Sequence, residues 1–175
     1  SLYRPEVIQA KEQGIAFTSS TDIFMDEVRS HKPECKIIAV SGSKGKSTST
    51  SALYHILHNL GYKVALGGNI GRPLIELIDG DYDYIVAEIS SYQASDLHSS
   101  PQIAMFTNLF FVHSAWHHSH ENYCRDKLHL IAHQQAVDVC FVNARNEELM
   151  KYIAEYPQHH SQYYDVAEGF HREGK

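Results

Sequence analysis

Short apolar runs rich in β-branched residues recur along the chain, and stretches with helical spacing separate several of them. The predicted strands are Ile15–Thr18, Ile37–Ser41, Lys63–Leu66, Tyr84–Ile89, Ile103–Thr107 and Val137–Val142. The predicted helices are Pro5–Gln13, Ser47–Leu60, Lys127–Gln135 and Glu147–Glu155. Apolar strands that alternate with helices are typical of a mainly parallel sheet covered by helices. The pattern therefore predicts an α/β fold, and residues 158–175 have too weak a pattern to assign.

The clearest helical spacing lies in Ser47–Leu60. Its apolar residues Leu53, Ile56, Leu57 and Leu60 fall on one face, and a glycine follows as the helix-ending residue. This helix comes directly after a loop that contains two glycines and two lysines, so the start of the helix is a candidate functional site.

Composition predicts a soluble, cytoplasmic, globular protein. The length of 175 residues suits a single domain. The 21 acidic residues outnumber the 15 basic ones, and the resulting net charge of -6 disfavours binding to nucleic acid. The three cysteines are widely spaced, which predicts reduced thiols. The sequence contains neither a signal-peptide pattern nor the apolar run of about 20 residues that a membrane helix needs.

A predicted strand, a glycine loop and a predicted helix follow one another between residues 37 and 60. The loop and the helix start consist of Gly42, Ser43, Lys44, Gly45, Lys46, Ser47 and Thr48. Glycines allow the backbone to approach phosphate groups, and the amides at a helix N-terminus point toward them. Lys46 would neutralise the β- and γ-phosphates, and the Ser47 hydroxyl would bind Mg²⁺. The segment therefore predicts a triphosphate site, although its spacing is shorter than that of the common phosphate loop.

A second candidate is the acid near the end of the predicted strand Tyr84–Ile89. Ligands of open α/β sheets bind outside the carboxyl ends of the strands, so Glu88 could bind Mg²⁺ opposite Ser47. The alternative is an ordinary glutamate that faces water at the end of a strand.

Four motifs in a fixed order resemble the Mur ligases, and in particular their MurD branch. The first is the loop, Ser41–Thr48. The others are Gly67–Gly71, Glu88–Gln93, and the series Asn108-Leu109, His113, Tyr123 and Lys127. The resemblance spans residues 2–143. It implies a P-loop NTPase-like central domain with a mainly parallel sheet flanked by helices.

The resemblance also implies an activity and a domain organisation. MurD enzymes use ATP to add glutamate to UDP-N-acetylmuramoyl-L-alanine in peptidoglycan synthesis, through an acyl phosphate. We expect residues 1–30 to lead into the central ATP-binding domain, and residues 31–175 to form that domain, truncated at its C-terminal end. The UDP-binding and glutamate-binding domains of the family have no counterpart in this sequence. We therefore expect a monomer that is inactive as this chain alone.

The resemblance assigns roles to individual residues. Lys46 would hold the phosphates of ATP and Thr48 would support the loop. The first Mg²⁺ would bind Ser47 and Glu88, and the second would bind His113. The muramoyl substrate would contact Asn69 and Ser90. Lys127 matches the lysine that this family carbamylates; without the resemblance it would be interpreted as a surface lysine at a helix start. The expected catalytic residues are Lys46, Lys127 and His113.

The sequence departs from the family pattern around His113. Val112 and Ala115 stand where the family usually has acids, and loss of such acids weakens metal binding. This departure weakens the prediction of a second Mg²⁺ and leaves a degenerate nucleotide-binding module as an alternative. A second alternative is a ligase similar to folylpolyglutamate synthase, which shares the type of loop. Lys44 and the segment Ser90–Gln93 resemble variants that add L-glutamate rather than D-glutamate.

Histidines are concentrated just after this departure. His113, His117, His118 and His120 fall within eight residues, and apart from Glu121 we expect no cysteine or acid to complete a metal site with them. Three interpretations remain: a polar loop with incidental histidines, a site for Zn²⁺ or Ni²⁺, and a pH sensor.

Overall fold

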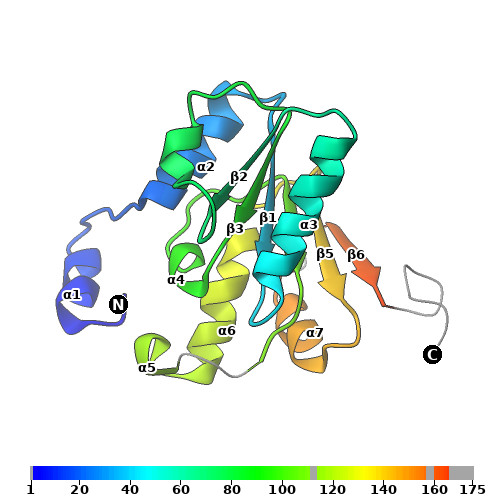
Figure 1. Cartoon of the computed structure of the whole chain (residues 1–175). Helices are drawn as coiled ribbons and strands as arrows, with labels where there is room; N and C mark the ends of the chain where they lie inside the picture. Colours follow the sequence, from blue (N-terminus) through cyan, green and yellow to red (C-terminus); the bar gives the residue numbers. More distant parts are fainter. Residues whose placement is uncertain (1, 111–113, 157–159, 166–175) are drawn as a thin grey trace.

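The computed structural model describes residues 2–110, 114–156 and 160–165. Within them the chain forms one parallel sheet with the strand order β2-β3-β1-β4-β5-β6 (Figure 1). The strands are β1 (Lys36–Ser41), β2 (Val64–Gly68), β3 (Tyr84–Glu88), β4 (Ile103–Phe106), β5 (Val139–Asn143) and β6 (His160–Tyr164). This is the parallel α/β fold that the sequence predicts.

Helices connect and cover the strands. The α-helices are α1 (Pro5–Glu12), α2 (Ser20–His31), α3 (Lys46–Asn59), α4 (Ser91–Ala94), α5 (Ser114–His117), α6 (His120–Leu128) and α7 (Glu147–Ile153). Two 3₁₀ helices are η1 (Leu74–Leu77) and η2 (His129–Ile131). None of the helices within the described ranges is long and apolar enough to cross a membrane.

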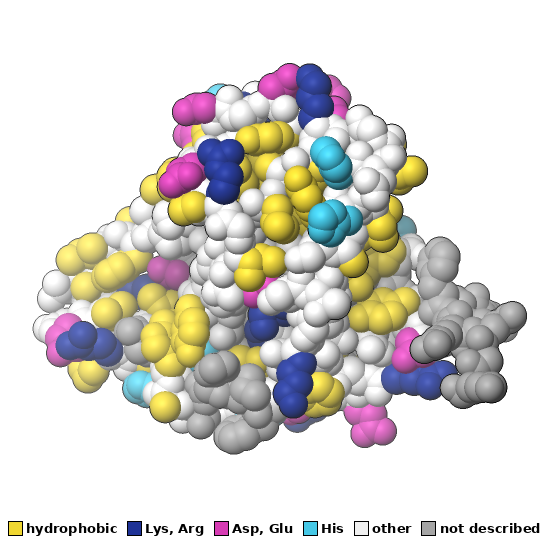
Figure 2. Space-filling model, in the orientation of Figure 1, with side chains coloured by type: hydrophobic (Ala, Val, Ile, Leu, Met, Phe, Trp, Pro, Cys, Tyr) yellow, Lys and Arg dark blue, Asp and Glu magenta, His cyan; other side chains and the backbone are white. Residues whose placement is uncertain are grey.

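The two faces of the sheet are covered differently. Alternate residues of β1, Ile37 and Ala39, join a buried cluster with side chains of α2, α4, α6 and α7. Their neighbours Ile38 and Val40 point to the opposite face, which α3 covers. In α3 the predicted apolar face is only partly buried, since Ile56 is 55% exposed. Figure 2 shows hydrophobic and histidine side chains at the surface over this helix.

All six strands end at the same edge of the molecule, where the loop after β1, α4, α5 and α6 gather (Figure 1). The register is specific at this edge. Glu88 of β3 aligns with Val40 of β1 and with Gly68 of β2, and Ser41 aligns with Phe106 of β4. The acid of β3 therefore lies beside the strand that leads into the glycine loop.

Two sequence-based assignments are wrong, and one segment left unassigned contains a strand. The predicted strand Ile15–Thr18 is wrong, because this largely exposed segment connects α1 to α2 and pairs with no strand within the described ranges. The predicted helix Lys127–Gln135 is wrong in position: α6 begins at His120, where Ser119 caps it by accepting a hydrogen bond from the Asn122 N–H. In the segment 158–175, left unassigned, residues 160–164 form the edge strand β6.

Candidate nucleotide-binding site

The loop between β1 and α3 has the backbone of a phosphate cradle. Gly42 has φ of 139° and Gly45 has φ of 83°, conformations that L side chains rarely adopt. A Cβ on Gly42 would lie 2.0 Å from Oγ1 of Thr107, so only glycine fits. Gly45 is the N-cap of α3 and leaves the first amides of that helix without a side-chain cap. Ser47 and Thr48, which follow, are exposed, so this helix start is accessible to an anion.

Two residues after β4 hold the loop in place. Oδ1 of Asn108 accepts a hydrogen bond from the Lys44 N–H at 2.9 Å, and its Nδ2 donates to the Lys44 carbonyl at 2.9 Å. The Thr107 hydroxyl donates to the same carbonyl at 2.7 Å. Sequence reasoning gave neither residue a role. Their position just beyond the carboxyl end of a central parallel strand is the signal that could have identified them.

Helix α6 contacts the loop from the other side. The hydroxyl groups of Tyr123 and Ser43 are hydrogen-bonded at 2.7 Å, and Nζ of Lys127 donates to the Gly42 carbonyl oxygen at 3.0 Å. The same Nζ lies 5.1 Å from the centre of the Tyr123 ring. Lys46 directs its own Nζ back to the Ser43 carbonyl at 3.4 Å. The loop is thus fixed by side chains from α6 and from the two residues that follow β4.

Lys127 is buried in the last turn of α6, with only 2% of its surface exposed. The interpretation of Lys127 as a surface lysine at a helix start is therefore wrong. Burial lowers its pKa to about 7, and the positive charge of Lys46 acts in the same direction. An appreciable fraction of Lys127 is consequently a neutral amine near neutral pH.

Glu88 is buried as well, which excludes the alternative of a strand-end glutamate facing water. It is 1% exposed, and its Oε1 accepts a hydrogen bond from Nδ2 of Asn69 at 2.8 Å. Its second oxygen, Oε2, is buried and finds no hydrogen-bond partner among the described residues. A buried carboxylate oxygen without a partner is costly, and a bound cation would satisfy it. The carboxylate thus fits the Mg²⁺ that accompanies a triphosphate.

A cavity of about 150 Å³ lies between the phosphate loop, α4 and α6. Its lining consists of Ser43, Lys46, Asn69, Ser90, Ser91, Tyr92, Tyr123 and Lys127. The hydroxyl of Ser90 also caps α4 in a reciprocal capping box with Gln93. A larger hollow of about 340 Å³ lies beside α2, but Asp22, Asp26 and Glu27 line it and would repel phosphate.

The histidine cluster divides into separate environments. His113 lies outside the described residues. His117 is fully buried, between Ser91 at 3.0 Å and Asp126 at 2.5 Å, and joins α4, α5 and α6. His118 is exposed and has a positive φ of 64°. The acid expected to complete a metal site, Glu121, instead pairs with Arg125 of the same helix at 2.7 Å. The expectation that no cysteine or other acid lies close to these histidines is wrong, because Cys124 and Glu148 both lie next to His120.

The fold and the site define the chain's class: an α/β domain with a parallel sheet and a phosphate loop of the P-loop type between its first strand and the following helix. Residues 40–171 match the family model of the Mur ligase middle domain. The chain belongs to the Mur ligase family.

Curated relatives include enzymes for both enantiomers of glutamate. The UDP-N-acetylmuramoylalanine–D-glutamate ligase of Acetivibrio thermocellus is 37% identical over 153 residues, which are 86% of this chain and 32% of the relative. The UDP-N-acetylmuramoyl-L-alanine–L-glutamate ligase of Xanthomonas axonopodis pv. citri is 39% identical over 137 residues, 75% of this chain and 29% of the relative. The chain thus spans about a third of the length of the relatives that it matches.

Solved structures of the family share the fold. MurF from Acinetobacter baumannii superposes with a TM-score of 0.66 at 19% identity, over 82% of this chain and 34% of that one. MurF from Thermotoga maritima, in complex with ADP, superposes with a TM-score of 0.63 at 19% identity, over 85% of this chain and 37% of that one. FolC from E. coli, in complex with ADP, superposes with a TM-score of 0.57 at 15% identity, over 90% of this chain and 50% of that one. These similarities show the fold, and the two curated relatives named above are both glutamate ligases.

Proposed function

We propose that this chain is the ATP-binding part of a cytoplasmic ligase that adds glutamate to UDP-N-acetylmuramoyl-L-alanine in peptidoglycan synthesis. The observation that carries the proposal is Oε2 of Glu88, which is buried beside a fixed phosphate loop and has no hydrogen-bond partner in the part of the chain that the structure describes. The names of the relatives supply the substrate and the amino acid. The ADP bound to the related MurF from Thermotoga maritima supports the nucleotide.

The roles of the loop residues follow from charge and position. ATP supplies a γ-phosphoryl group that activates the substrate carboxylate as an acyl phosphate, from which the amine of glutamate displaces phosphate. The Lys46 ammonium neutralises the phosphate oxygens, and the amides of the loop and of the α3 N-terminus donate to them. The Ser47 hydroxyl and the Glu88 carboxylate would hold Mg²⁺. The protein contributes positioning and charge neutralisation rather than a nucleophile.

Lys127 is proposed as the carbamylated lysine of the family. A carbamate forms when a neutral amine attacks CO₂: a C–N bond forms, one C=O π bond opens to a carboxylate oxygen, and the amine releases a proton. The lowered pKa of Lys127 makes the neutral amine available near pH 7. The product is an anion beside Lys46, with oxygens that suit a second Mg²⁺. The role of His113 at that second ion remains a proposal from the family pattern.

The substrate side of the cavity is proposed to include Asn69 and Ser90, which line it together with Lys46 and Lys127. Asn69 also keeps Glu88 in place, since its amide donates to Oε1. A substitution of Asn69 would therefore affect the metal and the substrate together.

The test is phosphate release by the full-length protein with ATP, Mg²⁺, UDP-N-acetylmuramoyl-L-alanine and either D- or L-glutamate. Release that depends on one enantiomer supports the proposal and identifies the amino acid, which relatives of both kinds leave open. Release with a folate substrate instead would favour the FolC-like alternative. A folded protein that binds ATP but releases no phosphate with any of them would favour a degenerate nucleotide-binding module.

A further inference from the structure

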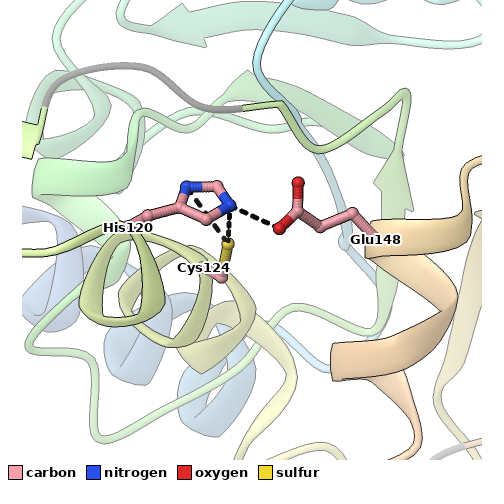
Figure 3. A group of neighbouring side chains, drawn as sticks. All are labelled: His120, Cys124 and Glu148. Carbon is pink, nitrogen blue, oxygen red and sulfur yellow. Dashed lines mark hydrogen bonds and ion pairs between the residues drawn. The ribbon is translucent and has the colours of Figure 1, made fainter.

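Three potential metal ligands from two helices meet between α6 and α7. His120 and Cys124 lie four residues apart in α6, so their side chains share one face of the helix. Glu148 lies in the first turn of α7. One ligand atom from each residue lies within 4.8 Å of the others. Figure 3 shows the three side chains pointing toward one another between the helices.

Nε2 of His120 contacts both of the other groups. It lies 3.6 Å from Sγ of Cys124 and is hydrogen-bonded to Oε1 of Glu148. With Zn–S of about 2.3 Å and Zn–N of about 2.0 Å, two ligand atoms on one tetrahedral zinc ion lie about 3.5 Å apart. The sulfur–nitrogen distance already has that length. Sγ also lies 3.9 Å from Nδ1 of the same ring, so the ring has to turn for Nε2 to face the ion. The carboxylate has to move outward, and the Glu148 side chain is 34% exposed.

The chemistry of the three groups selects the metal. A thiolate, an imidazole and a carboxylate are ligands of zinc, whereas Mg²⁺ prefers oxygen alone. The cluster is therefore distinct in kind from the oxygen site at Glu88. Its burial is graded: Cys124 is fully buried, while the side chain of His120 is 26% exposed. An ion can thus enter from solvent, and the sulfur remains protected.

We propose that His120, Cys124 and Glu148 form a zinc site that joins α6 to α7, with the fourth position open to water. Three protein ligands with one open position is a coordination that zinc adopts. Binding breaks the S–H bond of Cys124, forms a Zn–S bond and releases the proton to solvent. The site accounts for one histidine of the cluster that the phosphate chemistry leaves without a role.

The test uses Co²⁺, because cobalt bound to a thiolate gives a charge-transfer absorption band that histidine and carboxylate sites lack. The 175-residue chain, free of any histidine tag, is titrated with Co²⁺ and then with Zn²⁺. We expect one equivalent of Co²⁺ to produce the band and one equivalent of Zn²⁺ to remove it. We also expect Zn²⁺ to raise the unfolding temperature, because a ligand that binds only the folded state stabilises it.

Variants identify the ligands. Cys124→Ser should abolish the band, and Cys35→Ser, at a buried cysteine outside the cluster, should retain it. His120→Asn and Glu148→Gln alter partly exposed side chains, and both variants should fold. Each should weaken Zn²⁺ binding at least about tenfold, since even the loss of an outer partner of a metal ligand costs about 10–100-fold.

The opposite results would overturn the proposal. A band that survives Cys124→Ser, or that disappears in Cys35→Ser, assigns the thiolate to another position. Absence of the band in the folded wild-type chain means that the three groups form only a His120–Glu148 ion pair beside a thiol. Neither result affects the assignment of the nucleotide site, which does not involve these side chains.

Discussion

Nζ of Lys127 lies 3.0 Å from the carbonyl oxygen of Gly42, so the last turn of α6 is hydrogen-bonded to the first residue of the phosphate loop. A neutral amine and an ammonium group can both donate this hydrogen bond. The contact therefore persists in both protonation states, while only the neutral amine can react with CO₂. The same lysine thus supports the loop and, in our proposal, supplies the anion that the second Mg²⁺ needs.

The buried lysine predicts how stability depends on pH. The folded-state pKa of about 7 lies below the ordinary value of 10.5, so between these values the unfolded chain binds more protons. The free energy of unfolding should rise with pH between about 7 and 10.5, by at most about 1.4 kcal/mol per pH unit. Below about pH 7 the lysine is charged in both states, so the folded protein bears the full cost of burying the cation. Urea denaturation of wild type and Lys127→Met at several pH values checks this.

The stability difference between the two proteins should shift in favour of wild type as the pH rises from about 7 to about 10. Lys63→Met is the matched control, because Lys63 is an exposed lysine paired with Asp81. Parallel pH profiles for wild type and Lys127→Met would contradict the lowered pKa.

Carbamylation has a direct spectroscopic test. Full-length protein in ¹³C-labelled bicarbonate with Mg²⁺ and ATP should show one carbamate carbon resonance, because the neutral amine of Lys127 attacks CO₂. Lys127→Met should lack this resonance, and Lys63→Met should retain it. A resonance that persists in Lys127→Met would place the carbamate on another amine.

Lys46→Ala should abolish ATP-dependent phosphate release in the full-length protein. Loss of a cation from a phosphate site costs at least about 10²-fold in rate, by analogy with the removal of one oxyanion-stabilising donor. The variant should fold, since the hydrogen bond that Nζ of Lys46 makes among the described residues is a long one, 3.4 Å to the Ser43 carbonyl oxygen. Circular dichroism verifies folding, and Lys63→Ala serves as the control. Turnover that survives in Lys46→Ala would contradict the assignment of the phosphate loop.

Glu88→Gln tests the metal site with little change of shape. The amide keeps an oxygen that can accept from Asn69 but lacks the negative charge that attracts Mg²⁺. We expect the Mg²⁺ concentration for half-maximal phosphate release to rise at least about tenfold, equivalent to about 1.4 kcal/mol. Glu76→Gln, at an exposed residue paired with Arg72, is the control. An unchanged Mg²⁺ requirement in Glu88→Gln would exclude the carboxylate as a metal ligand.

Gly42→Ala should destabilise the chain by at least about 2 kcal/mol, because a methyl group would collide with Thr107 in addition to the backbone strain. Gly14→Ala is the matched control: its φ is also positive, at 79°, but nothing lies within 4 Å of the added atom. It should cost only the backbone strain, about 1–2 kcal/mol. Denaturation curves of both variants separate the backbone strain from the collision with Thr107. Equal losses of unfolding free energy would show that the methyl group does not collide with Thr107.

The strand–loop–helix at residues 36–59 was predictable because each of its features is local. The apolar strand, the glycines and the Lys-Ser pair lie within a few residues of one another. The burial of Lys127 was not predictable from local sequence, because it results from the docking of α6 against the loop 85 residues earlier in the chain. The family resemblance identified this residue where the pattern of neighbouring side chains pointed to the surface.

The errors in secondary structure have similar causes. Ile15–Thr18 has the composition of a strand, but no neighbouring strand pairs with it, and pairing is a tertiary property. Helix α2 went unpredicted although Ser19 caps it by accepting from the Asp22 N–H, a local serine–acid pattern that sequence inspection could have used. The site contacts of Thr107 and Asn108 depend on strand order, which propensities do not specify.

The hydrogen bonds that fix the phosphate loop join residues far apart in sequence: Ser43 and Tyr123 are 80 positions apart. Closing so long a segment costs entropy that is recovered only when the strands between have docked, which makes parallel sheets of this kind slow to fold. A partly folded chain in which α6 has not docked lacks the hydrogen bonds between Tyr123 and Ser43 and between Lys127 and Gly42. We therefore expect the loop to become fully ordered only after residues 123 and 127 have docked, late in the order in which the chain is synthesised.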